Sequence, residues 1–461
     1  MTLRQRLDAS PMSPYQWLII GVCTFLNALD GFDVLAMAFT ANQVSGEFAL
    51  SGSELGMLLS SGLVGMAIGS LVLAPFADVI GRRNMLIATT ALAAFGMFMS
   101  STADDALQLG GWRVVTGLGV GGILACTNVL ASEYASARWR GMAVSIYTAG
   151  YGVGATLGGM AAVVLQADHG WRSVFVFGGI CTTVALVLVL AFVPESVDFL
   201  VTRRPHRATA QIAAVGAKIR QPDLVRLAAA SWGGPADSST GSGQGDPRTG
   251  RGRTVHALFS PSNRRTTLLI WVAFFATMFG FYFVNSWTPK LLVTAGMTES
   301  QGVVGGLMLT LGGTFGSLFF GALTTKWSSR KVLLVFTVLS SITMVLFISA
   351  VGILALAFAA GIIVGMLING CIAGLYTITP TSYGVSMRST GVGWAIGIGR
   401  IGAIFAPLAA GALLDAAWTA GQLYLGVGAV VLVAAVAVGM LRPPAGASQS
   451  EGDRVEVPAR R

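Results

Sequence analysis

The chain has 461 residues, of which 54% are hydrophobic and only 11% are charged, and its formal net charge is +9. A soluble domain carries about 25% charged residues, so this composition excludes an ordinary soluble protein and predicts an integral membrane protein. The basic excess does not indicate nucleic-acid binding, because the positions of the basic residues follow the membrane topology inferred next.

Twelve apolar segments are long enough to cross a bilayer, which takes about 20 helical residues. With these segments as spans, all but four of the 29 Lys and Arg lie in the termini or the even-numbered connections. The positive-inside rule therefore predicts that both termini are cytoplasmic. We expect an all-α membrane protein with transmembrane helices at approximately residues 16–41, 54–77, 84–103, 109–134, 141–165, 172–194, 267–294, 302–325, 331–350, 353–379, 389–415 and 418–441.

The first span carries two aspartates at its middle, Asp30 and Asp33. A charge at the bilayer centre costs about 2.5–3.5 kcal/mol, so such residues face a cavity or take part in chemistry. They are three positions apart and share one helix face, where two close carboxylates favour binding a proton. All three histidines lie in connections, and no other acid lies as deep in a span. We predict that the pair carries protons. The alternative is a structural role, such as an ion pair between spans one and four.

The fourth span contains Arg113, about four residues inside its external end. Spans one and four run in opposite directions, so Arg113 and Asp33 are expected at similar depth. A cation beside a carboxylate favours the ionised form, so their pairing would trigger proton release. An arginine that snorkels to the membrane interface is the alternative.

A long connection after the sixth span divides the chain into two weakly similar halves. Residues 1–194 and 267–441 each contain six spans, and residues 195–266 form a cytoplasmic linker with a helix expected near Ala208–Ala230. Residues 442–461 form a polar cytoplasmic tail. Many secondary transporters are built from such repeats, with the substrate site near the midplane between them.

Several motifs resemble the major facilitator superfamily: Asp78-Val-Ile-Gly-Arg82-Arg83 after span two, Arg113-Val-Val-Thr-Gly117 in span four, and Pro194-Glu-Ser-Val-Asp-Phe-Leu200 after span six. The first copy departs from the usual loop signature at Ala74 and Val79. Within the superfamily, Asp30-Gly-Phe-Asp33, with Trp287-Thr-Pro289 and the glycine-rich run before Arg400, is similar to the aromatic acid:proton symporter family. This resemblance implies two six-helix bundles that import a benzoate-like or hydroxybenzoate-like anion with protons by alternating access.

The substrate carboxylate is expected at Arg400, the only deeply placed cation of the second half, about eleven residues into span eleven. A guanidinium offers two parallel N–H donors, which fit a carboxylate. The alternatives are bonds to backbone carbonyls or a gating partner. An apolar aromatic wall should hold the ring, and Asn285 would meet a ring hydroxyl. The candidates for this wall are Phe32, Tyr147, Tyr151, Tyr282, Phe281, Trp287, Tyr376 and Trp394.

Five charged residues are expected to meet at the cytoplasmic ends of the first half: Asp78, Arg82, Arg83, Glu133 and Arg140. We interpret them as a gate that latches in the outward-open state. The alternative is that they only set the topology.

The sequence thus predicts a multi-pass plasma-membrane importer of a monocyclic aromatic carboxylate, coupled to protons, working as a monomer without a cofactor. The alternatives are a symporter of the same fold for another small organic anion or a sugar, and a membrane sensor that binds its ligand without transport. An enzyme is not expected, because no nucleophile–base pair, HExxH motif or metal-ligand cluster appears in the sequence.

Overall fold

A computed structural model describes residues 6, 8–205, 208–221, 223–233, 258–261, 263–349, 352–383 and 387–441. Twelve of its helices are long and apolar enough to span a membrane, and each coincides with a predicted span to within a few residues. The spanning helices are α2 (Pro14–Glu47), α3 (Gly52–Ile80), α4 (Arg82–Ser101), α5 (Ala106–Tyr134), α6 (Arg140–His169), α7 (Trp171–Phe192), α12 (Arg264–Thr294), α13 (Glu299–Thr324), α14 (Ser329–Ser349), α15 (Leu354–Thr381), α16 (Arg388–Asp415) and α17 (Ala420–Met440).

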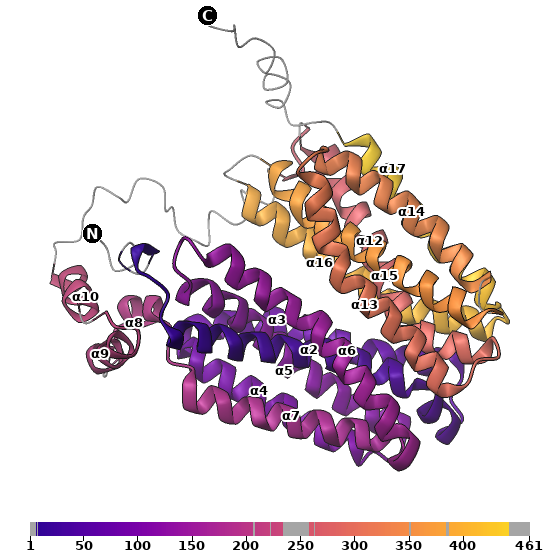
Figure 1. The fold of residues 1–461 in the computed structure, drawn as a ribbon, viewed down its shortest axis with the longest axis horizontal. Coiled ribbons are helices and arrows are strands. Elements are labelled where there is room, and N and C mark those ends of the chain that lie inside the picture. The colour runs from indigo at the N-terminus through magenta and orange to yellow at the C-terminus, as the bar shows by residue number, and fades with distance from the viewer. Residues whose placement is uncertain are drawn as a thin grey trace, which may run out of the picture.

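The spanning helices form two bundles, α2–α7 and α12–α17, which lie side by side in Figure 1. The two bundles share one packing pattern. The second helix of each bundle packs on the fourth (α3 on α5, α13 on α15), and the first packs on the fifth (α2 on α6, α12 on α16). The weak similarity between the halves of the sequence is therefore a structural repeat.

Glycines bring these helix pairs into backbone contact. A Cβ added to Gly154 of α6 would lie 1.8 Å from the carbonyl oxygen of Ala28 in α2. In the second bundle, a Cβ on Gly365 of α15 would lie 1.9 Å from the carbonyl oxygen of Leu309 in α13. Without a hydrophobic driving force between helices in lipid, close packing of small residues is a main source of helix association.

Local sequence sets where several spans begin. The helices α2, α3, α13 and α17 each begin with a capping box. In a capping box, the side chain of the N-cap residue bonds the backbone of the third helical residue, and the side chain of that residue bonds the backbone of the N-cap. Each box satisfies two backbone N–H groups that the first helical turn leaves unpaired. Such signals place helix starts at the ends of the hydropathy segments.

Short helices follow the first bundle: α8 (Val197–Arg203), α9 (Ala208–Lys218) and α10 (Leu224–Gly233). The single helix expected near 208–230 is therefore two helices, with a break at residues 219–223. Ile212 and Leu224 bury their side chains there, and Figure 1 places α8–α10 at the end of the bundle. The rest of the predicted linker between 234 and 257, and the predicted tail after 441, lie outside the described residues.

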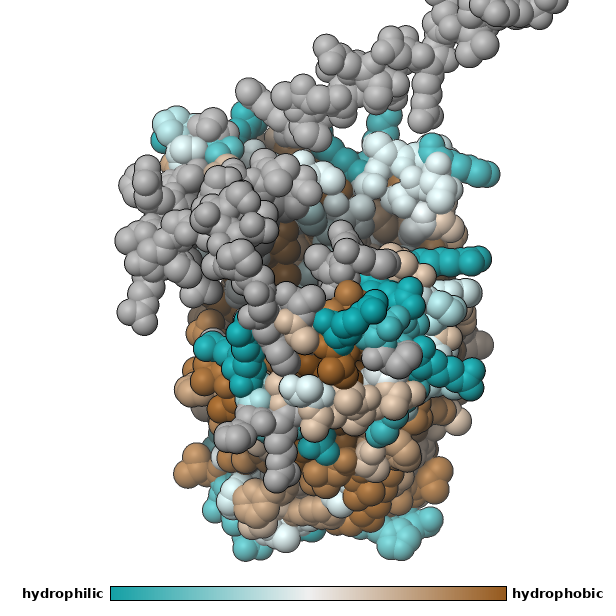
Figure 2. All heavy atoms as spheres, turned by 90° about the vertical axis from the view of Figure 1, so that its left-hand side faces the viewer, coloured by the Kyte–Doolittle hydropathy of each residue, from teal (hydrophilic) through white to brown (hydrophobic). Residues whose placement is uncertain are grey.

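An even number of spans puts the start of α2 and the end of α17 on one side of the membrane, which we call the terminal side; the opposite side is the far side. Figure 2 views the terminal side, where hydrophilic side chains gather beside the apolar surface of the bundles. Large apolar side chains such as Leu71, Leu157 and Leu318 are exposed along the spans, as lipid contact requires. That the terminal side is cytoplasmic stays a prediction.

The two bundles meet from the middle of the membrane to the far side. Thr156 and Thr310 approach to 3.4 Å between their hydroxyl oxygens, and Ser60 donates to the carbonyl of Ile404 at 2.9 Å. Nearer the far side, Gln43 donates to Glu299 at 3.3 Å. Toward the terminal side the bundles diverge (Figure 1). Among the described residues, these hydrogen bonds therefore join the bundles at the middle of the membrane and on the far side.

Candidate substrate and proton site

Asp33 of α2 and Arg113 of α5 form a buried, two-point ion pair. Arg113 Nη1 lies 2.5 Å from Asp33 Oδ1, and Nη2 lies 3.2 Å from Oδ2 and 2.9 Å from the Asp33 carbonyl oxygen. The two side chains are only 3% and 4% exposed. The expected similar depth of these residues is confirmed. The pair braces spans one and four, so the structural alternative describes this geometry as well as the proton-coupling interpretation does.

Asp30 lies one turn from Asp33 and is also buried. Among the described residues its Oδ1 has no hydrogen-bond partner. Both aspartates border a cavity of about 10 Å³, close to the smallest volume that holds one water molecule. An ionised carboxylate without a donor is costly to bury. The two acids of the pair therefore have different environments: one is neutralised by an arginine and the other is not.

Arg400 of α16 faces the space between the bundles. It lies close enough to Asp30, Tyr282 and Tyr376 for electrostatic interaction. Within the described part of the chain, no hydrogen bond or ion pair of its guanidinium is found. Gly393 and Gly397, at helical spacing on the same face, have no atom within 4 Å of an added Cβ, so this face of α16 is open. A half-buried, unpaired guanidinium deep in a span is suited to bind an anion.

Tyrosines from both bundles surround Arg400 and Asp30. Tyr151 of α6 interacts electrostatically with Tyr282 of α12 and with Asp30. Tyr282 also interacts with Tyr376 of α15, which is 42% exposed. Three of the four predicted wall tyrosines therefore come together beside the acid pair and the arginine, although they are spread from residue 151 to residue 376 of the sequence.

Phe281 and Asn285 flank this wall on α12. The Phe281 ring packs edge-on against Tyr282 at 5.1 Å between centroids. Asn285 lies one turn after Tyr282, so it shares the face, and its Nδ2 donates to the carbonyl of Phe281 at 2.8 Å. Tyr147 is buried nearer Asp30, and its hydroxyl lies 3.0 Å from that of Thr127.

Two aromatic candidates, Phe32 and Trp287, are buried in packing contacts, and a third, Trp394, stacks on another ring. Phe32 packs between α6 and α7, where its ring lies edge-on to Phe177 at 5.9 Å. Trp287 is fully buried and donates its Nε1 to the carbonyl of Pro407 at 3.2 Å, so it joins α12 to α16. Trp394 stacks on Trp271 at 5.7 Å between centroids. It is 44% exposed and lies three residues before Gly397, near the open face of α16. Phe32 and Trp287 therefore have packing roles in this conformation, whereas Trp394 stays a candidate for the wall.

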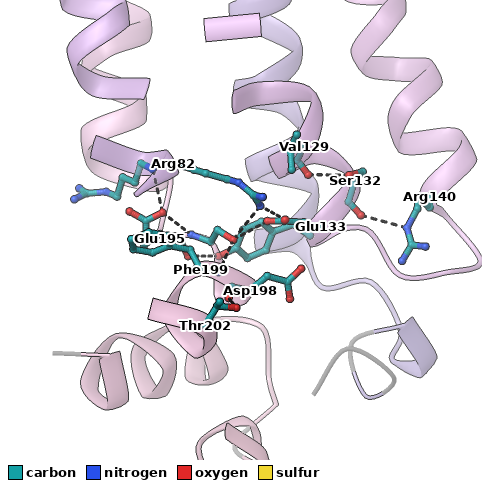
Figure 3. A network of polar contacts seen from close by, with 12 residues as sticks. Arg82, Val129, Ser132, Glu133, Arg140, Glu195, Asp198, Phe199 and Thr202 are labelled. Atoms are coloured by element: carbon teal, nitrogen blue, oxygen red, sulfur yellow. Dashed lines mark hydrogen bonds and ion pairs between the residues drawn. The ribbon is translucent and has the colours of Figure 1, made fainter. Parts of the chain in front are cut away.

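Two members of the predicted charge cluster, Arg82 and Glu133, lie together at the terminal side of the first bundle (Figure 3). The Arg82 guanidinium forms an ion pair with Glu133 at the end of α5. It also donates to Ser196 at 3.2 Å, and Ser196 donates to Glu133 at 2.7 Å. The start of α4, the end of α5 and the start of α8 are thereby tied together.

A second set of contacts anchors Arg83 to the segment after α7. Its side chain donates to the carbonyls of Val193 and Leu190 at 2.8 and 2.9 Å, and its backbone N–H donates to Glu195 at 3.1 Å. Gly81 has φ +100°, and a Cβ there would lie 2.3 Å from the Glu195 carboxylate. Sequence reasoning missed Glu195 and Ser196 as members of the cluster, although the motif Pro194-Glu-Ser had been recognised.

Arg140 stands apart from Arg82 and Arg83. It pairs with Asp8, in the segment before α2, and donates to the carbonyl of Ser132 at 3.3 Å. The side chain of Asp78 lies outside the described residues. These contacts lie within the first bundle and its adjoining segments, and a latch between the bundles stays a prediction.

Comparison with known proteins places this geometry in a family context. A family model described as Major Facilitator Superfamily matches residues 20–318 and 301–460. The chain is 31% identical to the gallate transporter of Pseudomonas putida, covering 94% of this chain and 93% of that one. It is 31% identical to the 4-hydroxybenzoate transporter PcaK of Pseudomonas aeruginosa, with the same coverage, and 32% identical to the 3-(3-hydroxy-phenyl)propionate transporter of Escherichia coli, covering 92% and 91%.

Solved structures show the same fold. The xylose transporter XylE of Escherichia coli in its inward-open conformation matches with a TM-score of 0.72 and 17% identity, over 94% of this chain and 97% of that one. At this identity the likeness concerns the fold alone.

Proposed function

We propose an activity from one established premise: the chain belongs to the Major Facilitator Superfamily, a family of transporters, and is a multi-pass plasma-membrane protein. The proposed activity is import of a monocyclic aromatic carboxylate together with protons, by alternating access between the two bundles. The observation that carries it is Arg400, an unpaired guanidinium among the described residues, beside Asp30 and three tyrosines. Relatives that match nearly the whole chain are named as transporters of aromatic acids.

The substrate carboxylate binds Arg400 through two parallel hydrogen bonds, the geometry that a guanidinium prefers. The ring then lies against Tyr282 and Tyr376, with Tyr151 on the side of the first bundle. Asn285 stands one turn from Tyr282, within reach of a ring hydroxyl. A site with contributions from both bundles lets substrate binding influence how the bundles move against each other.

Proton coupling rests on the difference between the two aspartates. Asp30 carries the transported proton, because its carboxylate has no buried donor among the described residues to stabilise its charge. Asp33 is paired with Arg113 and holds α2 and α5 in place. A protonated Asp30 also removes a negative charge from the neighbourhood of Arg400, which leaves the arginine available to the substrate anion.

Direction follows from topology. The positive-inside rule makes the terminal side cytoplasmic. The described conformation then opens toward the cytoplasm, where the substrate and proton leave.

The test is uptake in proteoliposomes. Purified protein should accumulate labelled 4-hydroxybenzoate or benzoate when the interior is made alkaline, and a protonophore should abolish the accumulation. Unlabelled aromatic acids should compete, and D-xylose should not. Competition by xylose alone would favour the sugar-symporter alternative, and saturable binding without uptake would favour a sensor.

A further inference from the structure

The far side of the boundary between the bundles is formed by two helix ends that touch through their backbones. α3 of the first bundle begins at Gly52, and α16 of the second ends at Asp415. A Cβ on Gly411 would lie 2.1 Å from the carbonyl oxygen of Gly52, and one on Gly56 would lie 2.5 Å from that of Pro407. No side chain separates the two helices at these points.

The Asp415 carboxylate caps the start of α3 across this boundary. The backbone N–H of Gly52 donates to its Oδ1 at 2.6 Å, and that of Ser53 donates to its Oδ2 at 2.8 Å. The first N–H groups of a helix have no partner within the helix and carry its positive partial charge, so a carboxylate is favourable there. Asp415 therefore links the bundles by charge as well as by hydrogen bonds.

The capping of α3 is otherwise complete within its own bundle. Ser51 accepts from the backbone N–H of Glu54 at 3.3 Å, and Glu54 accepts from that of Ser51 at 2.8 Å. Gly52 and Ser53 thus depend on the partner bundle, whereas Ser51 and Glu54 do not. Glu54 also lies close enough to Asp415 for the two carboxylates to repel each other. The backbone N–H groups of Gly52 and Ser53 therefore hold the Asp415 carboxylate in place.

We propose that Asp415 is the latch of the far side: it holds α3 to α16 while the cavity is open to the terminal side, and it must release Gly52 and Ser53 before substrate enters from the far side. The inference rests on the alternating access of the proposed function. It adds a gating residue outside both the substrate site and the terminal-side charge cluster.

The test measures opening of the far side directly. Ser60 lies at this boundary and is 1% exposed, so Ser60→Cys reports opening in a background where Cys23, Cys126, Cys181 and Cys371 are replaced. The protein is produced in intact cells, where only the far side faces the medium under the proposed topology, and is labelled with a membrane-impermeant maleimide. Asp415→Ala and Asp415→Asn should raise the labelling rate about two- to fivefold, the range expected when a charge is lost from an exposed helix start. Asp415→Glu should restore most of the protection.

Glu54→Gln is the matched control, because it neutralises a nearby carboxylate that does not bond the other bundle; its labelling rate should stay within about twofold of the parent. Gly411→Ala is a second variant that wedges the boundary while leaving Asp415 intact, and it should also raise labelling. If Gly411→Ala opens the boundary and the Asp415 variants do not, the latch is refuted. Equal rates in all variants refute it as well. Labelling needs neither substrate nor protons, so a failure of the uptake test leaves this result readable.

Discussion

Asp33 and Asp30 differ in what each would lose when its charge is removed. Asp33→Asn leaves the Arg113 guanidinium buried without its carboxylate, and breaking one side of a buried pair costs about 3–5 kcal/mol. Asp30→Asn breaks no hydrogen bond of Oδ1, because this atom has no partner among the described residues. We therefore expect Asp33→Asn to lower the melting temperature in detergent clearly, and Asp30→Asn to leave it near that of the parent.

The same two variants separate coupling from folding. Asp30→Asn should fold, exchange substrate across the membrane and yet lose accumulation driven by a pH gradient, because an amide cannot release and bind a proton. Asp33→Asn combined with Arg113→Gln should recover stability and also keep accumulation, because Asp30, the proton carrier in this account, is retained. Gradient-driven accumulation in Asp30→Asn at the parent rate would exclude Asp30 as the carrier.

Arg400 is the residue on which anion recognition depends in this account. Arg400→Lys keeps the charge and loses the planar pair of donors. Affinity for the aromatic carboxylate should fall by about 1.5–3 kcal/mol, or roughly ten- to hundredfold. The measurement is a binding titration with the carboxylate and with its uncharged amide.

The control for this substitution is Arg330→Lys, since Arg330 bonds the backbone carbonyls of Val438 and Gly439 away from the cavity. It should bind the carboxylate as the parent does. A parent protein that binds the amide as tightly as the acid would remove the charge-based role of Arg400.

At the scale of elements, the glycine contact between α2 and α6 decides whether the first bundle can assemble. An alanine at Gly154 would put its Cβ 1.8 Å from the Ala28 carbonyl oxygen, so the helices must separate. Overpacking of this kind costs about 1–3 kcal/mol. Gly154→Ala should lower both the folded yield and the melting temperature.

The control is Gly21→Ala on the partner helix α2, where an added Cβ meets no atom within 4 Å. It should be neutral or slightly stabilising, because alanine favours a helix over glycine by about 1 kcal/mol. Equal losses in both variants would show that helix propensity, and not the close contact, decides the outcome.

Element positions could be predicted well because a span leaves a strong one-dimensional signal of length and hydropathy. The rotation of a helix about its own axis, which decides where each side chain points, leaves a much weaker signal in the sequence. Hydropathy placed Phe32, Trp287 and Trp394 at the right depth, but it did not show that the rings of Phe32 and Trp287 turn into packing contacts. The intramembrane charges Asp30, Asp33, Arg113 and Arg400 could be identified because few structural reasons put a charge there. Glu195 was missed because its partners come from α4, which tertiary packing alone brings to it.

At the scale of the whole molecule, the site contains two acids, Asp30 and Asp33, so one or two protons could be transported with each substrate. Which number applies depends on the groups that contact each carboxylate. Symport of one proton with a monoanion moves no net charge, whereas a second proton would add about 2.3 kcal/mol of driving force per 100 mV. Because Arg113 neutralises Asp33 at 2.5 Å, we expect a single transported proton. Uptake at a fixed pH gradient should therefore change little when a potassium-diffusion potential of about 100 mV is imposed through valinomycin.

The Asp33→Asn/Arg113→Gln variant supplies the comparison for this measurement, because it retains Asp30 as the only acid of the pair. If the parent carried two protons, its uptake would respond strongly to an interior-negative potential, while that of the double variant would respond less. A parent that is insensitive to potential yet strongly sensitive to the pH gradient would support one-to-one coupling. Asp30 would then hold the proton that crosses the membrane, and Asp33 would stay paired with Arg113.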